Sequence, residues 1–306
     1  MCLMALMMKG PKNEAPGDFT SPIALPADAE QQRRWQDSNR LWWESHPMRY
    51  DWKKAVGCVE FSREFFEEID KRMPWRIWPF YSLIDIAALK NKDVLEIGVG
   101  NGSHAQLLAA AARSFTGIDI TEYGVRSTSE RMKVFGLPGK ILRMDAESMG
   151  FRDHSFDFIW TWGVIHHSAN TRGILKEMRR VLKPSGHAVT MVYHRGLWNY
   201  YTVGGIMRGI AGGDLFRTRS LHRTVQRHTD GAIARYYSLS EWRRMASEYF
   251  RVGRMRVFGD KTDLVPLPGG RVKDAAMVLI PDRVSRFLTN RCRFGSLLVS
   301  SLEKAQ

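Results

Sequence analysis

Strand-like and helix-like segments alternate along residues 92–194, and this alternation restricts the fold more than any other feature of the chain. Apolar runs typical of buried strands occupy residues 93–99, 114–120, 140–147, 156–163 and 187–194. Helical segments lie at 103–113, 129–136 and 171–183, and the sequence Pro-Ser-Gly stops the last one. Alternating strands and helices favour right-handed crossovers and a parallel sheet covered on both faces. We therefore predict an α/β, doubly wound, mostly parallel sheet with helices on both faces.

The flanking sequence divides the chain further. Residues 1–30 hold four prolines and little apolar periodicity, which predicts a loose leader, and residues 31–90 predict a helical lid. The main domain is expected over 91–306, with a Gly- and aromatic-rich insert at about 196–237, after the fifth strand. A helix is expected at 238–250, where Ser238 and Glu241 have the spacing of a capping box. Strands at 251–259 and 293–305 bring the predicted sheet to seven strands.

Composition excludes several classes of protein. With 44% hydrophobic and 25% charged residues the chain reads as globular, and no apolar run approaches the ~20 residues that span a bilayer. Three scattered cysteines give no zinc or dithiol spacing and favour a reducing cytoplasm. The net charge of +14 attracts nucleic acid, anionic lipid or acidic substrates, but the basic residues form no dense run. Charge alone does not identify a partner.

The first strand of the alternating region leads into the sequence VLEIGVGNGS, with glycines at positions 98, 100 and 102. A dinucleotide fingerprint has glycines at relative positions one, three and six, but position six here is Ser103. A phosphate loop needs Gly-Lys-Ser/Thr, which the sequence lacks. Glycines at one, three and five after an acidic strand end instead predict a bulky, phosphate-free ligand that lies against the backbone.

Carboxylates stand near the ends of three successive strands. Glu96 ends the first strand, Asp119 the second and Asp145 the third. Ligands of doubly wound sheets bind beyond the carboxyl ends of the strands, where a carboxylate can accept ribose hydroxyls. Glu96 can orient the glycine loop or a ligand ammonium group, and Asp145 can accept a hydrogen bond from an adenine amino group.

Four motifs in register resemble the S-adenosylmethionine-dependent methyltransferases of the seven-stranded, Rossmann-like class I, in particular the small-molecule and quinone methyltransferases with a type 11 domain. The matching stretches are VLEIGVGNGS, GIDIT, RMDAESMGFRDHSFDFIWTWGVIHH and RVLKPSGHAVTMVYH. The likeness covers roughly residues 90–195 and is weaker through 235–303. It implies an enzyme whose cofactor is S-adenosylmethionine.

The resemblance also implies which residues hold the cofactor. The methionine part is expected at the glycine loop, the ribose and adenine at the next two strand ends, and the sulfonium beside the end of the fourth strand. The implied residues, in that order, are Glu96, Gly98, Gly100, Asn101 and Gly102; Asp119 and Ile120; Asp145 and Ala146; and Trp162 and Gly163.

Methyl transfer from a sulfonium is an in-line displacement, which mainly needs alignment and dehydration of the reactants. The sequence WGVIHH after the fourth strand lacks the Asn/Asp-Pro-Pro-aromatic turn of base-amine methyltransferases, and no cysteine lies near this sheet end. No acidic cluster suggests a metal. We therefore expect a metal-free enzyme acting on a small-molecule, lipid or glycan acceptor. An RNA methyltransferase, or a cofactor-binding pseudoenzyme that regulates a partner, remains an alternative.

His166 and His167 are the candidate general bases, because a near-neutral pKa suits proton removal from a hydroxyl. The alternative, which we favour from sequence, is that an imidazole caps the strand end or packs beneath the pocket. A base is needed only when the acceptor arrives protonated.

Candidate acceptor residues come from segments flanking the core. They are Tyr50, Tyr193, His228 and Asp230. An ordinary turn at Asp230-Gly231 is the competing interpretation for the last of these. The aromatic insert allows peripheral contact with a membrane surface, although a pocket roof or a dimer contact is the more common role of such a helix. The oligomeric state is left open.

Overall fold

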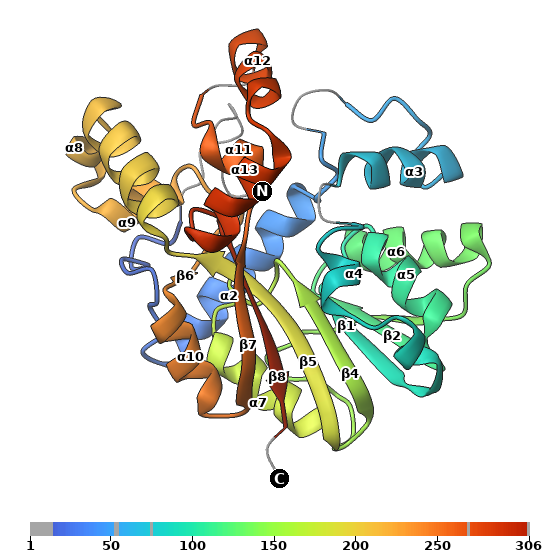
Figure 1. Cartoon of the computed structure of the whole chain (residues 1–306). Coiled ribbons are helices and arrows are strands. Elements are labelled where there is room, and N and C mark those ends of the chain that lie inside the picture. Colours follow the sequence, from blue (N-terminus) through green and yellow to red (C-terminus); the bar gives the residue numbers. More distant parts are fainter. Residues whose placement is uncertain (1–14, 52–54, 74–75, 268–269, 305–306) are drawn as a thin grey trace.

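The computed structural model describes residues 15–51, 55–73, 76–267 and 270–304. A twisted sheet crosses the molecule with helices packed on both sides (Figure 1). The path of neighbouring strands is β3-β2-β1-β4-β5-β8-β7, and a short β6 pairs with β5. The strands are β1 Asp93–Ile97, β2 Ser114–Asp119, β3 Lys140–Arg143, β4 Phe156–Trp162, β5 Leu182–His194, β6 Tyr236–Tyr237, β7 Arg251–Phe258 and β8 Leu297–Glu303.

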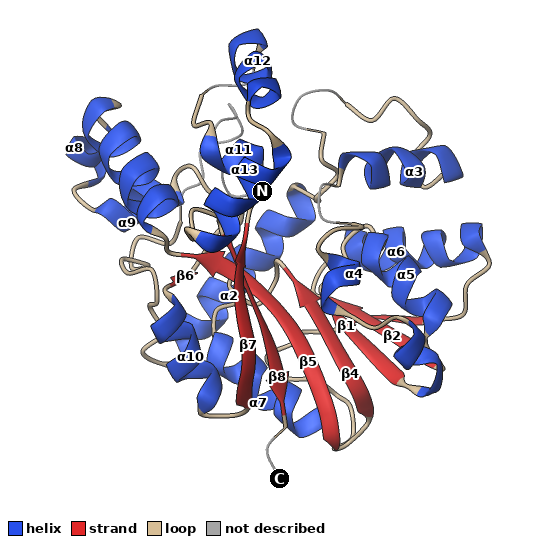
Figure 2. Ribbon diagram, viewed as in Figure 1, coloured by secondary structure: helices blue, strands red, loops and turns tan. Residues whose placement is uncertain are grey.

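The predicted doubly wound, mostly parallel sheet is confirmed. Strands β1 to β6 pair in parallel, whereas β8 is antiparallel to both of its neighbours, β5 and β7. The strand order reverses between β1 and β4, because the chain runs outward to β3 and then returns to the other side of β1. Figure 2 shows the strands as one continuous layer between helices. β6 adds one strand to the seven that the sequence predicts.

Helices fill the connections of the sheet and extend beyond one end of it. They are α2 Ala29–Ser45, α3 Arg63–Arg72, α4 Phe80–Leu83, η1 Ala87–Asn91, α5 Ser103–Ala111, α6 Glu122–Phe135, α7 Thr171–Val181, η2 Leu197–Ala211, α8 Asp214–Thr218, α9 Leu221–Gln226, α10 Leu239–Ser247, α11 Lys261–Leu264, α12 Arg271–Leu279, α13 Asp282–Arg286 and η3 Phe287–Arg291. η1 is a 3-10 helix, and η2 and η3 are hydrogen-bonded as π-helices.

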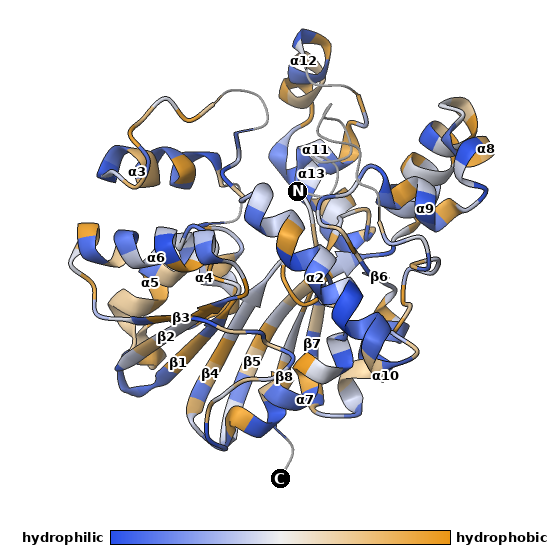
Figure 3. Ribbon diagram, turned by 180° about the vertical axis from the view of Figure 1, so that it is seen from behind, coloured by the Kyte–Doolittle hydropathy of each residue, from blue (hydrophilic) through white to orange (hydrophobic). Residues whose placement is uncertain are grey.

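Period-two alternation in the strands builds two hydrophobic layers. Val94 and Phe158 point into the layer under α4, η1 and α5, while their neighbours Leu95 and Ile159 point into the layer under α7 and α10. Figure 3 shows the apolar side of α7 against the sheet and its polar side facing outward. Both faces of the sheet are therefore buried, as parallel strands require.

Two local predictions differ from the structure. Helix α7 ends at Val181, and the Pro-Ser-Gly sequence lies inside β5, where the pairing with β4 shifts register between Phe156 and Phe158. A bulge admits a proline that a regular ladder excludes. The described part of the expected loose leader, residues 15–28, is also packed: Phe19 is 1% exposed, and its ring contacts Trp35 at 5.3 Å.

The buried side chain of Arg235 explains why residues 15–28 pack. Its guanidinium donates hydrogen bonds to the carbonyls of Ala24, Ser168 and Ala169, and it lies 5.3 Å from the Phe19 ring. A buried cation is costly unless such acceptors surround it. The N-terminal segment therefore completes the solvation of Arg235.

Among the described residues, no helix is long and apolar enough to cross a membrane.

Candidate active site

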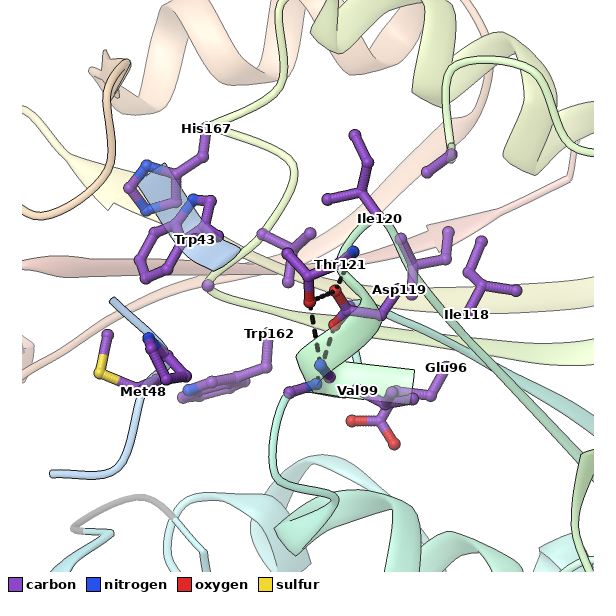
Figure 4. A pocket seen from close by; sticks show the side chains of 18 of the residues that line it. Trp43, Met48, Glu96, Val99, Ile118, Asp119, Ile120, Thr121, Trp162 and His167 are labelled. Atoms are coloured by element: carbon purple, nitrogen blue, oxygen red, sulfur yellow. Dashed lines mark hydrogen bonds between the residues drawn. The ribbon is translucent and has the colours of Figure 1, made fainter. Parts of the chain in front are cut away.

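A pocket lies beyond the carboxyl ends of β1, β2 and β4, at the point where the strand order reverses. Figure 4 shows side chains converging on it from the glycine loop after β1, the end of β2, the end of β4 and the N-terminal lid. The predicted cofactor residues that line it are Glu96, Gly98, Gly100, Asn101, Asp119, Ile120, Asp145, Ala146, Trp162 and Gly163. Gly102 does not line it; this residue precedes α5 as its N-cap, with φ +74°.

The glycine loop approaches the pocket with bare backbone. Gly98 has φ +77°, and a Cβ there would stand 2.2 Å from a methyl carbon of Val164. Gly100 has φ +52°, and a Cβ there would meet no protein atom within 4 Å. Position 98 requires glycine, because its backbone is left-handed and Val164 packs against it. At position 100 the missing side chain leaves open space in the pocket. This is a cradle in which a ligand can lie against the main chain.

Asp119 fixes the shape of that cradle. Its carboxylate accepts hydrogen bonds from the Gly100 amide at 2.9 Å and from the Thr121 amide and hydroxyl at 2.9 and 2.7 Å. Burial raises the pKa of Asp119, and these three hydrogen bonds oppose the rise. Each carboxylate oxygen accepts about two hydrogen bonds, so Oδ1, which accepts both bonds from Thr121, is fully used, and Oδ2 keeps one lone pair beyond the Gly100 amide.

Glu96 is the least satisfied group in the pocket. Its side chain is 3% exposed, and its Oε2 atom has no hydrogen-bond partner among the described residues. Burial, with a contribution from the nearby Asp119 carboxyl, raises the pKa of Glu96 well above its ordinary value, and Arg131 only partly opposes this. A buried carboxyl oxygen without a donor is costly, so this atom marks the place for a ligand donor such as an ammonium group.

The lid closes the pocket at two points. From α2, Gln36 donates a hydrogen bond to Asp145 at 2.9 Å and accepts one from the Ala169 amide at 2.9 Å. After α2, the carbonyl of Met48 accepts a 2.7 Å hydrogen bond from the Asn101 side chain, in the glycine loop. The lid is therefore attached to the loop after β3 and to the loop after β1.

His167 lies at one end of the pocket and Glu96 at the other (Figure 4). The Nδ1 atom of His167 lies 2.6 Å from the carbonyl oxygen of Ile233, so it must donate, and Nε2 is left as the acceptor. Nε2 has no hydrogen-bond partner among the described residues. Burial lowers the pKa of His167, although the Asp230 carboxylate partly opposes this, so the imidazole is neutral at pH 7.

Neighbouring residues hold the ring of His167 in place. Trp43 of the lid packs edge-on against it at 4.9 Å between ring centroids. Behind it, Gly231 has φ +79°, and a Cβ there would stand 2.4 Å from His167 Nδ1. The chain bends at Asp230 and Gly231. The glycine leaves room for the hydrogen bond between His167 Nδ1 and the Ile233 carbonyl.

The remaining candidates occupy different positions. His166 is fully buried, outside the pocket lining, with its ring 3.9 Å from that of Tyr193, and burial lowers its pKa well below the ordinary value. Tyr193 donates a 2.7 Å hydrogen bond to Asp230. Tyr50 lines the pocket, and Asp230 contributes to raising the pKa of Tyr50. Tyr50, Tyr193, Asp230 and His167 are therefore brought together.

His228 does not join that group. Its Nε2 atom lies 2.6 Å from a carboxylate oxygen of Asp214, at the start of α8 in the insert. His228 does not line the pocket, so this geometry gives no support to its predicted contact with an acceptor.

Sequence reasoning missed the residues that the lid contributes. Gln36, Asn39 and Trp43 line the pocket from one face of α2, and Met48 lines it from the segment that follows. Glu44 accepts hydrogen bonds from the Glu122 and Tyr123 amides at 2.8 and 3.0 Å, at the N-terminus of α6. The spacing of three and four residues between positions 36, 39 and 43 was the available signal, since such positions share a helix face.

Among the described residues, no cluster of three or more His, Cys, Asp or Glu side chains forms a metal site. The strand order with its antiparallel β8, the glycine loop and the carboxylates near successive strand ends define a class I methyltransferase fold with a pocket at the carboxyl ends of its strands.

Comparison with known proteins gives the domain its family. Residues 95–190 match the family described as methyltransferase domain. A sarcosine dimethylglycine methyltransferase from Galdieria sulphuraria, provisionally so named, shares the fold, with a TM-score of 0.51 and 18% identity over 88% of this chain and 98% of that one.

Three curated relatives are similar over shorter stretches. The tRNA U34 carboxymethyltransferase of Cellvibrio japonicus is 27% identical over 43% of this chain and 48% of its own length. The phthiotriol/phenolphthiotriol dimycocerosates methyltransferase of Mycobacterium tuberculosis is 35% identical over 32% and 37%. The fatty-acid O-methyltransferase of Mycolicibacterium smegmatis is 30% identical over 39% and 44%. Each alignment spans less than half of the relative.

The chain therefore carries a class I methyltransferase domain, whose cofactor is S-adenosylmethionine. The pocket fits that cofactor on its own evidence, because Glu96 Oε2 lacks a donor and the glycine loop leaves a cradle of bare backbone.

Proposed function

We propose that this protein transfers a methyl group from S-adenosylmethionine to a hydroxyl group of an apolar, lipid-type small molecule, with His167 as the general base. One observation carries the proposal: His167 lines the pocket with a neutral, unpartnered Nε2 atom, because its Nδ1 atom is committed to Ile233. A fixed tautomer with a free lone pair is the arrangement that proton removal requires.

The end of the pocket around Glu96 would hold the cofactor. Glu96 Oε2 would accept a hydrogen bond from the methionine ammonium group, and the bare backbone of Gly100 would lie against the methionine chain. Asp119 would use the remaining lone pair of Oδ2 for a ribose hydroxyl, and Asp145, held by Gln36, would face the adenine. Thus the proposed polar contacts of the cofactor come from the carboxyl ends of β1 and β2 and from the loop after β3.

The opposite end of the pocket would hold the acceptor. Figure 4 places Trp43, Met48 and Trp162 on the His167 side of the pocket. Tyr50 and Met73 also belong to the lining, together with the polar Asn39. Such a lining favours a hydrocarbon body, because burying apolar surface contributes about 25 cal/mol per Å². His167 Nε2 can then accept a hydrogen bond from a hydroxyl group of the acceptor, and the unpartnered Oδ1 atom of Asn39 is a second acceptor atom in the pocket.

S-adenosylmethionine supplies an activated methyl group bound to a sulfonium sulfur. In the proposed reaction the acceptor oxygen forms the new bond to the methyl carbon as the bond from carbon to sulfur breaks, and the electron pair of that bond stays on sulfur. His167 Nε2 takes the proton of the hydroxyl group, and Asp230 stabilises the imidazolium that results. Trp43 and the lid keep water away from the reacting atoms.

Two of the relatives support a lipid-type acceptor, since their names specify dimycocerosates and a fatty acid. The supporting stretches are short, so the acceptor of this chain needs a direct test. Purified protein would be incubated with methyl-labelled cofactor and, separately, with a long-chain alcohol, a fatty acid and transfer RNA. We expect label in the ether of the alcohol. Labelling of the fatty acid alone would contradict the hydroxyl assignment, because a carboxylate needs no base.

A second candidate acceptor is RNA. The tRNA-modifying relative and the net charge of +14 favour it. Label appearing only in transfer RNA, together with an electrophoretic shift of that RNA, would replace the lipid proposal. The third possibility is a pseudoenzyme. It would bind the cofactor in a calorimetric titration but would transfer no label to any molecule in extracts of its own host.

A further inference from the structure

The insert after β5 forms a helical hairpin whose tip is apolar and exposed. Helix η2 runs out from β5, and α8 and α9 return along it (Figure 1). At the tip, residues 206–219, four apolar side chains face solvent: Ile206 is 57% exposed, Met207 39%, Ile210 55% and Phe216 74%. Isolated exposed apolar residues are ordinary, but such a group within one tip marks an interaction surface.

Packing within the hairpin does not account for these side chains. The buried residues of η2 include Tyr200, Val203 and three glycines. A Cβ on Gly204 would stand 2.6 Å from Val225, and one on Gly205 would stand 3.0 Å from Leu221. The glycines thus bring α9 against η2 while Ile206 and Ile210 stay outside. A helix with apolar side chains on both faces is normally buried on both, so the outer face of η2 is suited to contact a second apolar surface.

A second apolar tip projects from the same end of the molecule, apart from the first (Figure 1). Helix α12 exposes Val272 by 74%, Val278 by 81% and Leu279 by 81%, and η3 after it exposes Phe287 by 58%. Figures 1 and 3, which view the molecule from opposite sides, both place α8 and α12 beyond the carboxyl ends of the strands, at the end that holds the pocket. The two tips are separate projections, so a flat surface can contact both.

The charges beside the tips select the kind of surface. Arg217 and Arg219 belong to the hairpin tip, and Arg223 follows in α9; all three are exposed. Arg219 and Arg223 form no salt bridge with any described residue. Asp214, the acidic residue of this tip, lies 2.6 Å from His228 and 3.9 Å from Arg217. Free arginines around exposed apolar side chains complement an anionic lipid surface.

We propose that the hairpin tip and α12 together dock this protein on an anionic membrane surface, with the pocket end facing the lipid. Ile206, Ile210 and Phe216 from one tip and Val278 and Leu279 from the other insert among the acyl chains. Arg217, Arg219 and Arg223 pair with lipid phosphates. This deepens the proposed function, since it gives a lipid-type acceptor a route to the pocket, but docking itself requires no methyl transfer.

Aromatic side chains pack at the end of β7 and at the base of the hairpin. The exposed Trp78 packs against Phe258, the last residue of β7, at 5.5 Å between ring centroids. Trp198, near the start of η2, stacks on Phe294 at 5.6 Å. Tryptophan is common at membrane interfaces because its ring is apolar and its N–H group is polar.

The test is sedimentation of the full chain with vesicles of phosphatidylcholine alone and of phosphatidylcholine mixed equally with phosphatidylglycerol. We expect binding to the mixed vesicles and weaker binding as salt rises. The variant Ile210→Asp/Leu279→Asp should bind at least about tenfold more weakly, because two apolar anchors are lost. Leu41→Asp is the matched control, since Leu41 on α2 is 56% exposed and lies outside both tips, and it should bind like the parent.

A second pair of variants isolates the charge. Arg217→Gln/Arg219→Gln should weaken binding to mixed vesicles about fivefold for each arginine. Lys140→Gln/Arg152→Gln removes the same charge from exposed residues near the starts of β3 and β4, at the other end of the sheet, and should change binding little. Circular dichroism and cofactor titration would show that every variant is folded.

Several outcomes would overturn the docking proposal. The first is an absence of binding to mixed vesicles at low salt. The second is an equal loss of vesicle binding in the tip variants and in their control variants. Ultracentrifugation showing a dimer that Ile210→Asp/Leu279→Asp dissociates, with no vesicle binding, would assign the tips to self-association. None of these results bears on cofactor binding or on methyl transfer to a dispersed acceptor, so the two proposals fail separately.

Discussion

The two ends of the pocket are built in different ways. The end around Glu96 and Asp119 is made of short loops that follow β1 and β2, and Asp119 bonds residues in those two loops. The end around His167 joins side chains from α2, the loop after β4 and the turn at 231. The first end is set by backbone geometry next to each strand. The second depends on helices and turns that pack from far along the chain, so it is the end that can change with the acceptor.

This contrast predicts that variants at the His167 end alter turnover and variants at the Glu96 end alter cofactor affinity. His167→Gln should lower kcat about a hundredfold to ten thousandfold, the usual contribution of a general base, and leave the cofactor Kd unchanged. His166→Gln is the control, since His166 lies outside the pocket lining. Single-turnover rates and calorimetry measure the two quantities. Unchanged turnover in His167→Gln would remove the base.

The pH dependence of the same step sharpens the assignment. A base must be unprotonated, and burial lowers the pKa of His167 below its ordinary value. We therefore expect kcat/KM to stay level from pH 8 down through the range where an exposed histidine titrates, about 6.5, and to fall only at lower pH. A fall centred at or above the ordinary histidine value would indicate another base.

Asp119→Ala should have the next largest effect, on binding. It removes the acceptor for the Gly100 amide and for the proposed ribose contact, and hydrogen bonds to a charged group contribute about 1.5–3 kcal/mol each. We expect the cofactor Kd to rise about a hundredfold or more in calorimetric titration. Asp157→Ala is a control, because this carboxylate lies at the other end of the sheet, where it accepts from Lys183.

Glu96→Gln should separate affinity from stability. The carboxyl is buried, and burial raises its pKa in the folded protein. The free energy of unfolding therefore falls as pH rises from the unfolded-state pKa of this group to its folded-state pKa, because the unfolded chain loses the proton first. Removing that charge should stabilise the ligand-free protein at pH 7 by about 1 kcal/mol, the scale of stabilising changes at strained functional sites. Thermal unfolding with and without cofactor measures both effects. A less stable ligand-free variant would contradict this account of Glu96.

The smallest effect is expected at the lid. Gln36→Ala removes a hydrogen bond to Asp145 and should weaken cofactor binding about three- to tenfold, since a neutral hydrogen bond contributes about 1 kcal/mol. Gln32→Ala is a close match: it lies one turn earlier on α2 and donates to Glu147, but does not line the pocket. Equal losses in both variants would mean that the lid acts only through stability.

The sequence by itself determined the sheet, the glycine loop and the positions of Glu96 and Asp119. Their signals are local: strand periodicity, positive-φ glycines and acidic residues near strand ends all lie within a few residues of the structure that they specify. It also placed the insert and the helix at Ser238, whose capping box forms as predicted.

Only the tertiary structure shows which of the adjacent residues His166 and His167 lines the pocket. His167 does so, and it also contacts the Ile233 carbonyl, whereas His166 lies outside the lining. It also brought Gln36 to Asp145 and docked residues 15–28 around Arg235. These contacts join residues separated by about a hundred positions or more, and no periodicity within either segment encodes such a pairing. They form because buried polar groups must find partners once the sheet and its helices have packed.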